Sequence, residues 1–308
     1  MRAVFYESFG GTEVLQVGEV SEPKIGPDTV LVRCRATSVN PVDWKIMKGF
    51  LDSRMDAVFP VVPGWDLAGV VEAVGPSVEE FETGDEVFGY ARMDYVHHGT
   101  FATYSAVPVR TLSRKPKSLS FEEAGVIPLA GLTAYQGLVH HLKVRTDETV
   151  LISGGAGGVG VFAIQIALTL GAKVVATCSP SNFDFVRSLG AVPVPYGAGF
   201  EEALNEEIDE GVHAFFDLYG GDGLLSGRDH LFDKARVASV ADPGIRELGG
   251  HYVFVRPSKE DLDELSTLAI QGLLQTKIEH SFELDQTREA FELSMSGHAR
   301  GKLAISIA

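Results

Sequence analysis

The sequence predicts an α/β protein in which a doubly wound parallel sheet accompanies a β-rich domain. Continuous apolar segments at Thr149–Ser153 and Lys173–Thr177 have the composition of strands that are buried on both faces of a sheet. Helix-length segments alternate with these strands and with later ones, which is typical of parallel sheets. Residues 1–120, in contrast, contain short β-branched and aromatic runs that Gly, Pro and Asp interrupt.

Local signals place the individual elements. Strands are predicted at Thr29–Arg35, Leu67–Val74 and Phe101–Val107 in the β-rich part. After Leu119 the character changes, and Ser120 with Glu123 forms a capping-box pattern that begins a helix. Further helices are predicted near Leu132 and at 161–170, 182–189 and 261–274, and further strands at Val192–Pro195, Ala214–Leu218, Arg236–Val240 and Tyr252–Val255.

The end of the chain predicts a strand–helix–strand unit that returns to the β-rich domain. Lys277–Phe282 and Lys302–Ile307 have strand character, and Gln286–Ser296 has helical character. The sheet domain would then be inserted in a split domain. We therefore predict a β-rich domain at 1–121 and 272–308, and a sheet domain at 122–271.

Composition excludes several classes of partner. The formal net charge is −16, so the surface repels the phosphates of nucleic acids and anionic lipids. The N-terminus lacks the apolar region of a signal peptide, and no apolar run reaches the ~18 residues that span a bilayer. A soluble cytoplasmic protein is the expectation. Only two cysteines occur, Cys34 and Cys178, too few for a disulfide framework or a four-cysteine zinc site.

A glycine-rich turn between a strand and a helix predicts a dinucleotide phosphate site. Gly155, Gly157 and Gly160 satisfy G-x-G-x-x-G directly after a buried strand. The first glycine permits the tight turn, the second lets a pyrophosphate approach, and the third lets helix and strand pack closely. The free N–H groups at the helix start, around Gly158 and Val159, would hold the phosphates without any basic side chain.

The end of the second strand favours NADPH over NADH. A carboxylate at this place would bind the ribose hydroxyl of NAD and repel the phosphate of NADP. The sequence instead has Ser179, Ser181 and Asn182, with Arg187 and Lys173 nearby along the chain. The alternative is that the serines only cap the following helix.

These motifs, taken in order, carry a resemblance to a known family. The chain resembles the zinc-independent, quinone oxidoreductase (zeta-crystallin-like) branch of the medium-chain dehydrogenase/reductase superfamily over nearly its whole length. The resemblance implies a GroES-like catalytic domain split around a Rossmann domain, and a homodimer. It rests on segments at 40–45, 59–71, 84–87, 131–135, 165–167 and 298–302, besides the glycine turn.

The positions that hold catalytic zinc in related enzymes lack zinc ligands here. By the resemblance they fall at Asn40, Trp65 and about Leu129. None of these offers the thiolate or imidazole that tetrahedral zinc prefers, so no metal site is expected. A hydride acceptor that needs no Lewis acid, such as a quinone or an α,β-unsaturated carbonyl compound, is then the expected substrate.

The resemblance also suggests site residues. Asn40 would line the nicotinamide and substrate region and donate to an oxyanion, unless it only shapes its turn. Lys45 stands near a position where several relatives carry Tyr, and if desolvated it could donate a proton; the alternative is a solvated surface Lys. The further residues expected to contact the cofactor are Thr133, Tyr196, Phe254, Val255 and Lys302.

Three functions follow as hypotheses. The first is an NADPH-dependent reductase of quinones or of the C=C bond of α,β-unsaturated carbonyl compounds. The second is an enoyl-thioester reductase, although the Tyr of the relatives is missing near position 45. The third is an NADPH-binding redox sensor with little turnover.

Overall fold

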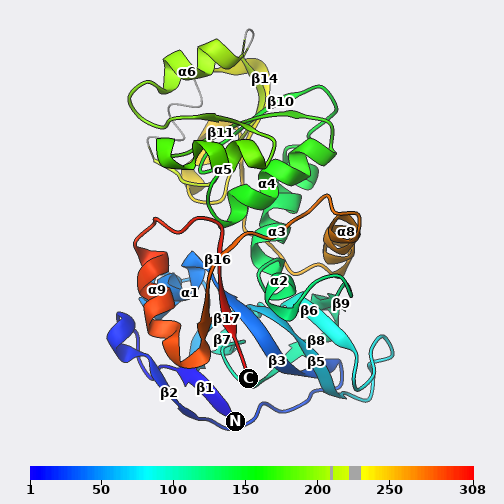
Figure 1. The fold of residues 1–308 in the computed structure, drawn as a ribbon. Helices are drawn as coiled ribbons and strands as arrows, with labels where there is room; N and C mark the ends of the chain where they lie inside the picture. Colours follow the sequence, from blue (N-terminus) through cyan, green and yellow to red (C-terminus); the bar gives the residue numbers. More distant parts are fainter. Residues whose placement is uncertain (209–210, 222–229) are drawn as a thin grey trace. The chain divides into compact units, whose positions relative to one another are not determined.

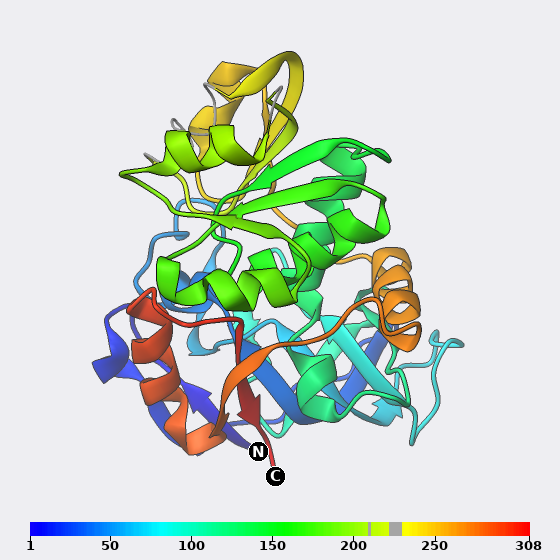
Figure 2. The same cartoon turned by 45° about the horizontal axis from the view of Figure 1, so that its top comes forward.

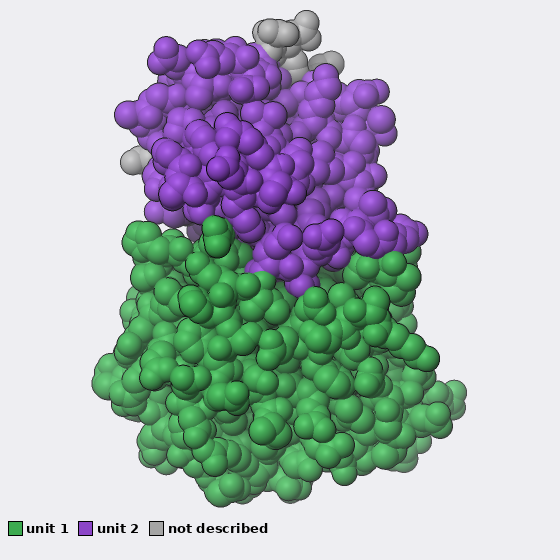
Figure 3. Space-filling view, viewed as in Figure 1, with its two compact units in different colours: residues 1–129, 256–270, 278–308 green, residues 130–255, 271–277 purple. Residues whose placement is uncertain are grey.

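The computed structural model describes residues 1–208, 211–221 and 230–308 (Figure 1). The chain forms two compact units (Figure 3). Unit 1 comprises residues 1–129, 256–270 and 278–308, and unit 2 comprises residues 130–255 and 271–277. The helix at 259–270, which the sequence assigned to the sheet domain, therefore belongs to unit 1.

Unit 2 contains a parallel sheet of six strands, as predicted. Its strand order is β12-β11-β10-β13-β14-β15, so the chain winds in one direction from β10 and then in the other. The strands are β10 (Thr149–Ile152), β11 (Lys173–Thr177), β12 (Val192–Val194), β13 (Val212–Asp217), β14 (Leu231–Ser239) and β15 (His251–Tyr252).

Helices cover both faces of this sheet (Figures 1 and 2). Helix α6 packs Phe200 and Leu204 against a cluster that contains Val175. Helix α4 lies on the other face, where its Ile164 comes close to Ala176, the next residue of the same strand. The α-helices among the described residues of unit 2 are α3 (Pro128–Tyr135, whose first two residues belong to unit 1), α4 (Gly158–Thr169), α5 (Phe183–Ser188) and α6 (Phe200–Glu207). None of the described helices is long and apolar enough to cross a membrane.

Hydrogen bonds to Asp217 connect the carboxyl ends of strands β10, β13 and β14. Its carboxylate accepts hydrogen bonds from the hydroxyls of Ser153, at 2.7 Å, and Ser239, at 2.5 Å. It also accepts from the backbone N–H of Gly220, at 2.9 Å. The buried carboxyl group is thus satisfied by hydrogen bonds that join the ends of these strands.

Unit 1 contains a sheet of order β16-β17-β3-β5-β6-β9, with β8 paired to β3. The C-terminal strand β17 runs antiparallel to β3 and pairs Ala304 with Ser38. The predicted return of the chain to the β-rich domain is therefore present. The strands are β3 (Thr29–Val39), β5 (Asp66–Val74), β6 (Glu86–Tyr90), β8 (Tyr104–Pro108), β9 (Leu112–Arg114), β16 (Ile278–Glu283) and β17 (Lys302–Ser306).

Two pairs of short strands and four helices complete unit 1. Strand β1 (Arg2–Phe5) pairs with β2 (Gln16–Glu19), and β4 (Ala57–Val62) pairs with β7 (Val96–His98). The capping box predicted at Ser120 and Glu123 is confirmed at the start of α2. The helices are α1 (Pro41–Met47), α2 (Phe121–Gly125), α8 (Lys259–Ile270) and α9 (Thr287–Met295).

Candidate active site

The predicted catalytic residue Asn40 stands where strand β3 turns into helix α1. Pro41 occupies the first position of the helix, which suits its fixed φ angle. The carboxylate of Asp43, one turn into the helix, accepts a 2.7 Å hydrogen bond from the backbone N–H of Asn40 through Oδ2. Asn40 therefore has the turn-shaping role that was the alternative for this residue, as the N-cap of α1.

Asn40 belongs to a buried polar network with Asp66 and Lys302. Asp66 begins β5 and Lys302 begins β17, so three elements distant in sequence meet here. The Asn40 side-chain amide donates to Asp66 Oδ2 at 2.8 Å, and its carbonyl oxygen accepts from Lys302 Nζ at 2.6 Å. Lys302 Nζ lies 3.8 Å from Asp66 Oδ2.

Two further donors bond to Asp66. The Ser38 hydroxyl donates to Oδ2 at 2.6 Å, and the backbone N–H of Leu129 donates to Oδ1 at 2.6 Å. Three donated hydrogen bonds and an ammonium group favour the charged carboxylate, although Asp66 is fully buried. The sequence does not show this network, because the donors of Asp66 come from segments that are not adjacent in sequence.

Burial shifts the pKa of each ionisable group of the network, and the partners of each group oppose that shift. It raises the pKa of Asp66, and Lys302, Ser38 and Asn40 partly oppose this. It lowers the pKa of Lys302, which the charges of Asp66 and Asp43 oppose. Burial likewise raises the pKa of Asp43 to about 8, against the hydrogen bond from Asn40 N–H. Asp43 is therefore largely protonated at neutral pH.

The structure changes the interpretation of the two lysines. Lys302, which was expected to contact the cofactor, is 3% exposed in unit 1 and donates a hydrogen bond to Asn40. Its contact with a cofactor stays a prediction. A proton donor at Lys45 was expected only if its side chain were desolvated. The side chain is instead exposed, and its Nζ lies 5.6 Å from the centroid of the Trp44 ring. The described residues contain no group of three His, Cys, Asp or Glu side chains placed to hold a metal ion.

In unit 2 the three glycines of the turn have different surroundings. A Cβ atom on Gly155 would lie 2.6 Å from Ala176 Cβ, and one on Gly160 would lie 2.3 Å from Gly154 O. A Cβ atom on Gly157 would meet only Gly154 O, at 3.4 Å. Two glycines therefore allow strand and helix to pack, and Gly157 borders open space.

No side chain caps the N-terminus of α4 beside this space. Gly157 is the N-cap residue and has no side chain to accept from the first turn. The N–H groups at Gly158 and Val159 thus lack the capping partner that Ser or Asp would supply. Because α4 spans 12 residues, its dipole adds positive potential at this end.

The polar residues predicted after β11 lie at the same edge of the sheet as the glycine turn. Asn182 donates to the Ser179 hydroxyl, and the hydroxyls of Ser179 and Ser181 lie 3.0 Å apart. Lys173 begins β11 and so stands at the opposite end of the strand, away from this edge. Arg187 is paired with Asp184 at 3.1 Å.

The remaining predicted residues also belong to unit 2. Tyr196 follows β12 and is 65% exposed, beyond the carboxyl end of its strand. Thr133 is buried in α3. Phe254 and Val255 follow β15, the former exposed and the latter buried. Their contact with a cofactor stays a prediction.

Comparison with known proteins agrees with this architecture. Residues 26–117 match the alcohol dehydrogenase GroES-like domain, and residues 189–305 match the zinc-binding dehydrogenase family. The chain belongs to the medium-chain dehydrogenase/reductase superfamily, in its quinone oxidoreductase branch. It is therefore an oxidoreductase, and the predicted fold class is confirmed.

Three similar proteins illustrate the match. The chloroplast envelope quinone oxidoreductase homolog of Arabidopsis thaliana is 30% identical, with 99% of this chain and 98% of that protein aligned. The NADPH-dependent alkenal/one oxidoreductase of the same plant is 32% identical, over 99% of this chain and 79% of that protein. The quinone oxidoreductase structure from Coxiella burnetii has a TM-score of 0.89 at 30% identity, covering 100% of this chain and 99% of that one.

The raised pKa of Asp43 predicts how stability depends on pH. Burial raises the pKa of this carboxyl group from about 4 in the unfolded chain to about 8 in the folded protein. The free energy of unfolding therefore falls as the pH rises between these two values. Asp43→Asn, which cannot ionise, removes this cost. We expect the melting temperature of the variant, relative to that of the wild type, to rise from pH 5 to about pH 8 and then to level off, by calorimetry in matched buffers. A difference that does not change with pH would show that Asp43 is not buried as a neutral acid.

Proposed function

We propose that the protein reduces quinones, or the C=C bond of α,β-unsaturated carbonyl compounds, with NADPH. The glycine turn is the main support for a dinucleotide cofactor. Its Gly157 borders open space, next to the first N–H groups of α4, which no side chain caps. The substrate class is supported by relatives named for quinone and alkenal/one reduction.

The edge of the sheet beyond β11 supports NADPH rather than NADH. The hydroxyls of Ser179 and Ser181 and the amide of Asn182 are donors suited to a phosphate. No carboxylate stands among Cys178, Ser179, Pro180 and Ser181 to accept from a ribose hydroxyl. Tyr196, whose ring is exposed, would contact the adenosine end of the cofactor.

The buried network of unit 1 would receive the negative charge of the reaction. When bound, NADPH supplies the hydride, and the acceptor then carries an enolate or hydroquinone oxygen. One N–H of the Asn40 amide is committed to Asp66, whereas the other has only 3.4 Å contacts to Ser38. This second N–H is the donor that we assign to the oxyanion. Lys302, bonded to the carbonyl of the same amide, strengthens that donor.

Matched alanine substitutions in the turn test the cofactor site. Gly157→Ala places a methyl group in open space, so we expect the melting temperature to change by less than about 2 °C while the dissociation constant for NADPH rises about ten-fold or more. Gly160→Ala is the control, because its methyl group overlaps backbone and should lower the melting temperature by several degrees. Unchanged NADPH affinity in Gly157→Ala would contradict the placement of the phosphates.

A substrate panel tests the reaction. NADPH consumption at 340 nm is followed with ortho-quinones, para-quinones, enones, enals and simple ketones. We expect turnover of quinones or enones and none of simple ketones, since the latter need stronger polarisation of the carbonyl. Turnover of enoyl thioesters alone would favour the second hypothesis. NADPH binding without turnover of any acceptor would favour a redox sensor.

A further inference from the structure

Two histidines of unit 2 come together at the amino-terminal edge of the parallel sheet. His141 ends a π-helical turn, η3 (Gln136–His141), and His251 is the first residue of the edge strand β15. Their ring centroids lie 5.3 Å apart, and the ring planes are tilted by 41°. The glycine turn follows β10 at the carboxyl ends of the same parallel strands, so this pair is separate from the proposed cofactor site.

The nitrogen atoms of both rings are accessible and unoccupied. His141 is half-buried and His251 is exposed, and no nitrogen of either ring is a buried atom without a partner. In the part of the chain that the structure describes, neither imidazole makes a hydrogen bond or an ion pair. The neighbouring His140 differs, because its ring packs edge-on against Tyr135, with the centroids 5.6 Å apart.

The His141 ring is suited to bind a metal ion at neutral pH. Burial lowers the pKa of His141, and the nearby His251 and His140 lower it further. The neutral imidazole therefore prevails, and one of its nitrogens has a lone pair that can bind a cation. Two imidazolium ions at this distance would repel each other, whereas two neutral rings can share one cation.

The separation of the two rings fits tetrahedral zinc. A Zn–N bond of about 2.05 Å, added to about 1.15 Å from a ring nitrogen to the ring centre, places each centre about 3.2 Å from the metal. Two such centres are about 5.2 Å apart at the tetrahedral angle of about 109°, and about 4.5 Å apart at the octahedral angle of about 90°. The observed 5.3 Å agrees with the tetrahedral arrangement.

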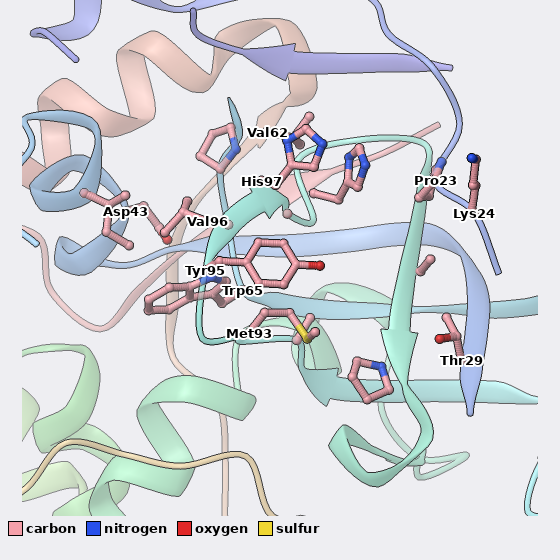
Figure 4. Close-up of a pocket in the computed structure, with 18 of the residues that line it drawn as sticks. Pro23, Lys24, Thr29, Asp43, Val62, Trp65, Met93, Tyr95, Val96 and His97 are labelled. Atoms are coloured by element: carbon pink, nitrogen blue, oxygen red, sulfur yellow. The ribbon is translucent and has the colours of Figure 1, made fainter. Parts of the chain in front are cut away.

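A second pair of histidines lacks this geometry. His97 and His98 are adjacent in β7 and line a cavity of unit 1 (Figure 4). Their ring centroids are 3.7 Å apart, which is too close for both rings to bind one metal ion. In addition, Nδ1 of His97 lies 2.6 Å from the carbonyl oxygen of Val58, so a hydrogen bond occupies this nitrogen. This pair therefore provides a control within the same chain.

We propose that His141 and His251 bind one Zn²⁺ ion in tetrahedral coordination, with two water molecules as the remaining ligands. The described residues contain no group of three His, Cys, Asp or Glu side chains placed to hold a metal ion, which leaves the other two positions to water. The positions that hold catalytic zinc in related enzymes fall elsewhere, at Asn40, Trp65 and about Leu129. The bound ion would connect η3 to β15 and stabilise the folded state of unit 2 by mass action.

Titration calorimetry of the full chain with zinc chloride tests the site. We expect one equivalent of zinc to bind, and His141→Gln and His251→Gln each to weaken binding at least about ten-fold, because each removes one of the two protein ligands. The double variant should lose little more than either single variant, since both residues bind the same ion. His98→Gln is the matched control and should keep the wild-type affinity within about two-fold. Wild-type affinity in His141→Gln or His251→Gln, or no zinc binding to the wild type, would overturn the proposal.

Melting temperatures separate zinc binding from folding. Without zinc, each Gln variant should melt within about 2 °C of the wild type and bind NADPH with unchanged affinity, because both histidines lie away from the core and from the glycine turn. Saturating zinc should raise the melting temperature of the wild type and of His98→Gln, but not of the other variants. An equal rise in all of them would overturn the proposal.

Cobalt tests the coordination geometry, because tetrahedral Co²⁺ absorbs visible light far more strongly than octahedral Co²⁺. We expect an intense visible band when Co²⁺ is added to the wild type, and its loss in the His141→Gln, His251→Gln double variant. The weak spectrum of octahedral Co²⁺ in the wild type would overturn the tetrahedral site.

Discussion

The burial of the Asp66 carboxylate is the constraint on which the catalytic end of unit 1 depends. A buried charge without partners is very costly, so the surrounding chain must supply donors. They come from Ser38 and Asn40 at the end of β3, from the backbone of Leu129, and from Lys302 at the start of β17. The same bonds fix the orientation of the Asn40 amide. Structure and proposed chemistry are therefore consequences of one electrostatic requirement.

This requirement also explains why the C-terminal strand must return to unit 1. Strand β17 pairs with β3, and that pairing brings Lys302 beside Asn40, 262 residues away along the chain. Without this cation, Asp66 and the nearby Asp43 would be two buried acids with only neutral donors around them. The ion pair compensates one of them, and the other remains protonated.

Sequence alone predicted what is encoded locally. The glycine turn, the strands β10 and β11 and the capping box at Ser120 each depend on residues within a few positions, and all are present. The hydrogen bond of Lys302 to Asn40 and its ion pair with Asp66 could not be predicted, because these partners lie on other elements and only the pairing of β17 with β3 brings them together. The exposure of Lys45 could not be predicted either, because the sequence of a short helix such as α1 does not show which of its faces other elements will cover. The approach of His141 to His251 had no signal in the sequence, because the two residues lie on elements that only the folded unit brings together.

The energetic coupling between Asp66 and Lys302 tests most directly whether the burial of Asp66 depends on Lys302. Urea unfolding of Asp66→Asn, Lys302→Met and the double variant can be followed by tryptophan fluorescence, because both tryptophans, Trp44 and Trp65, belong to unit 1. The account predicts that the two losses of unfolding free energy are not additive and that the double variant is more stable than their sum implies, by about 1–3 kcal/mol. Losses that add within about 0.5 kcal/mol would show that the two residues do not depend on each other, and would contradict it.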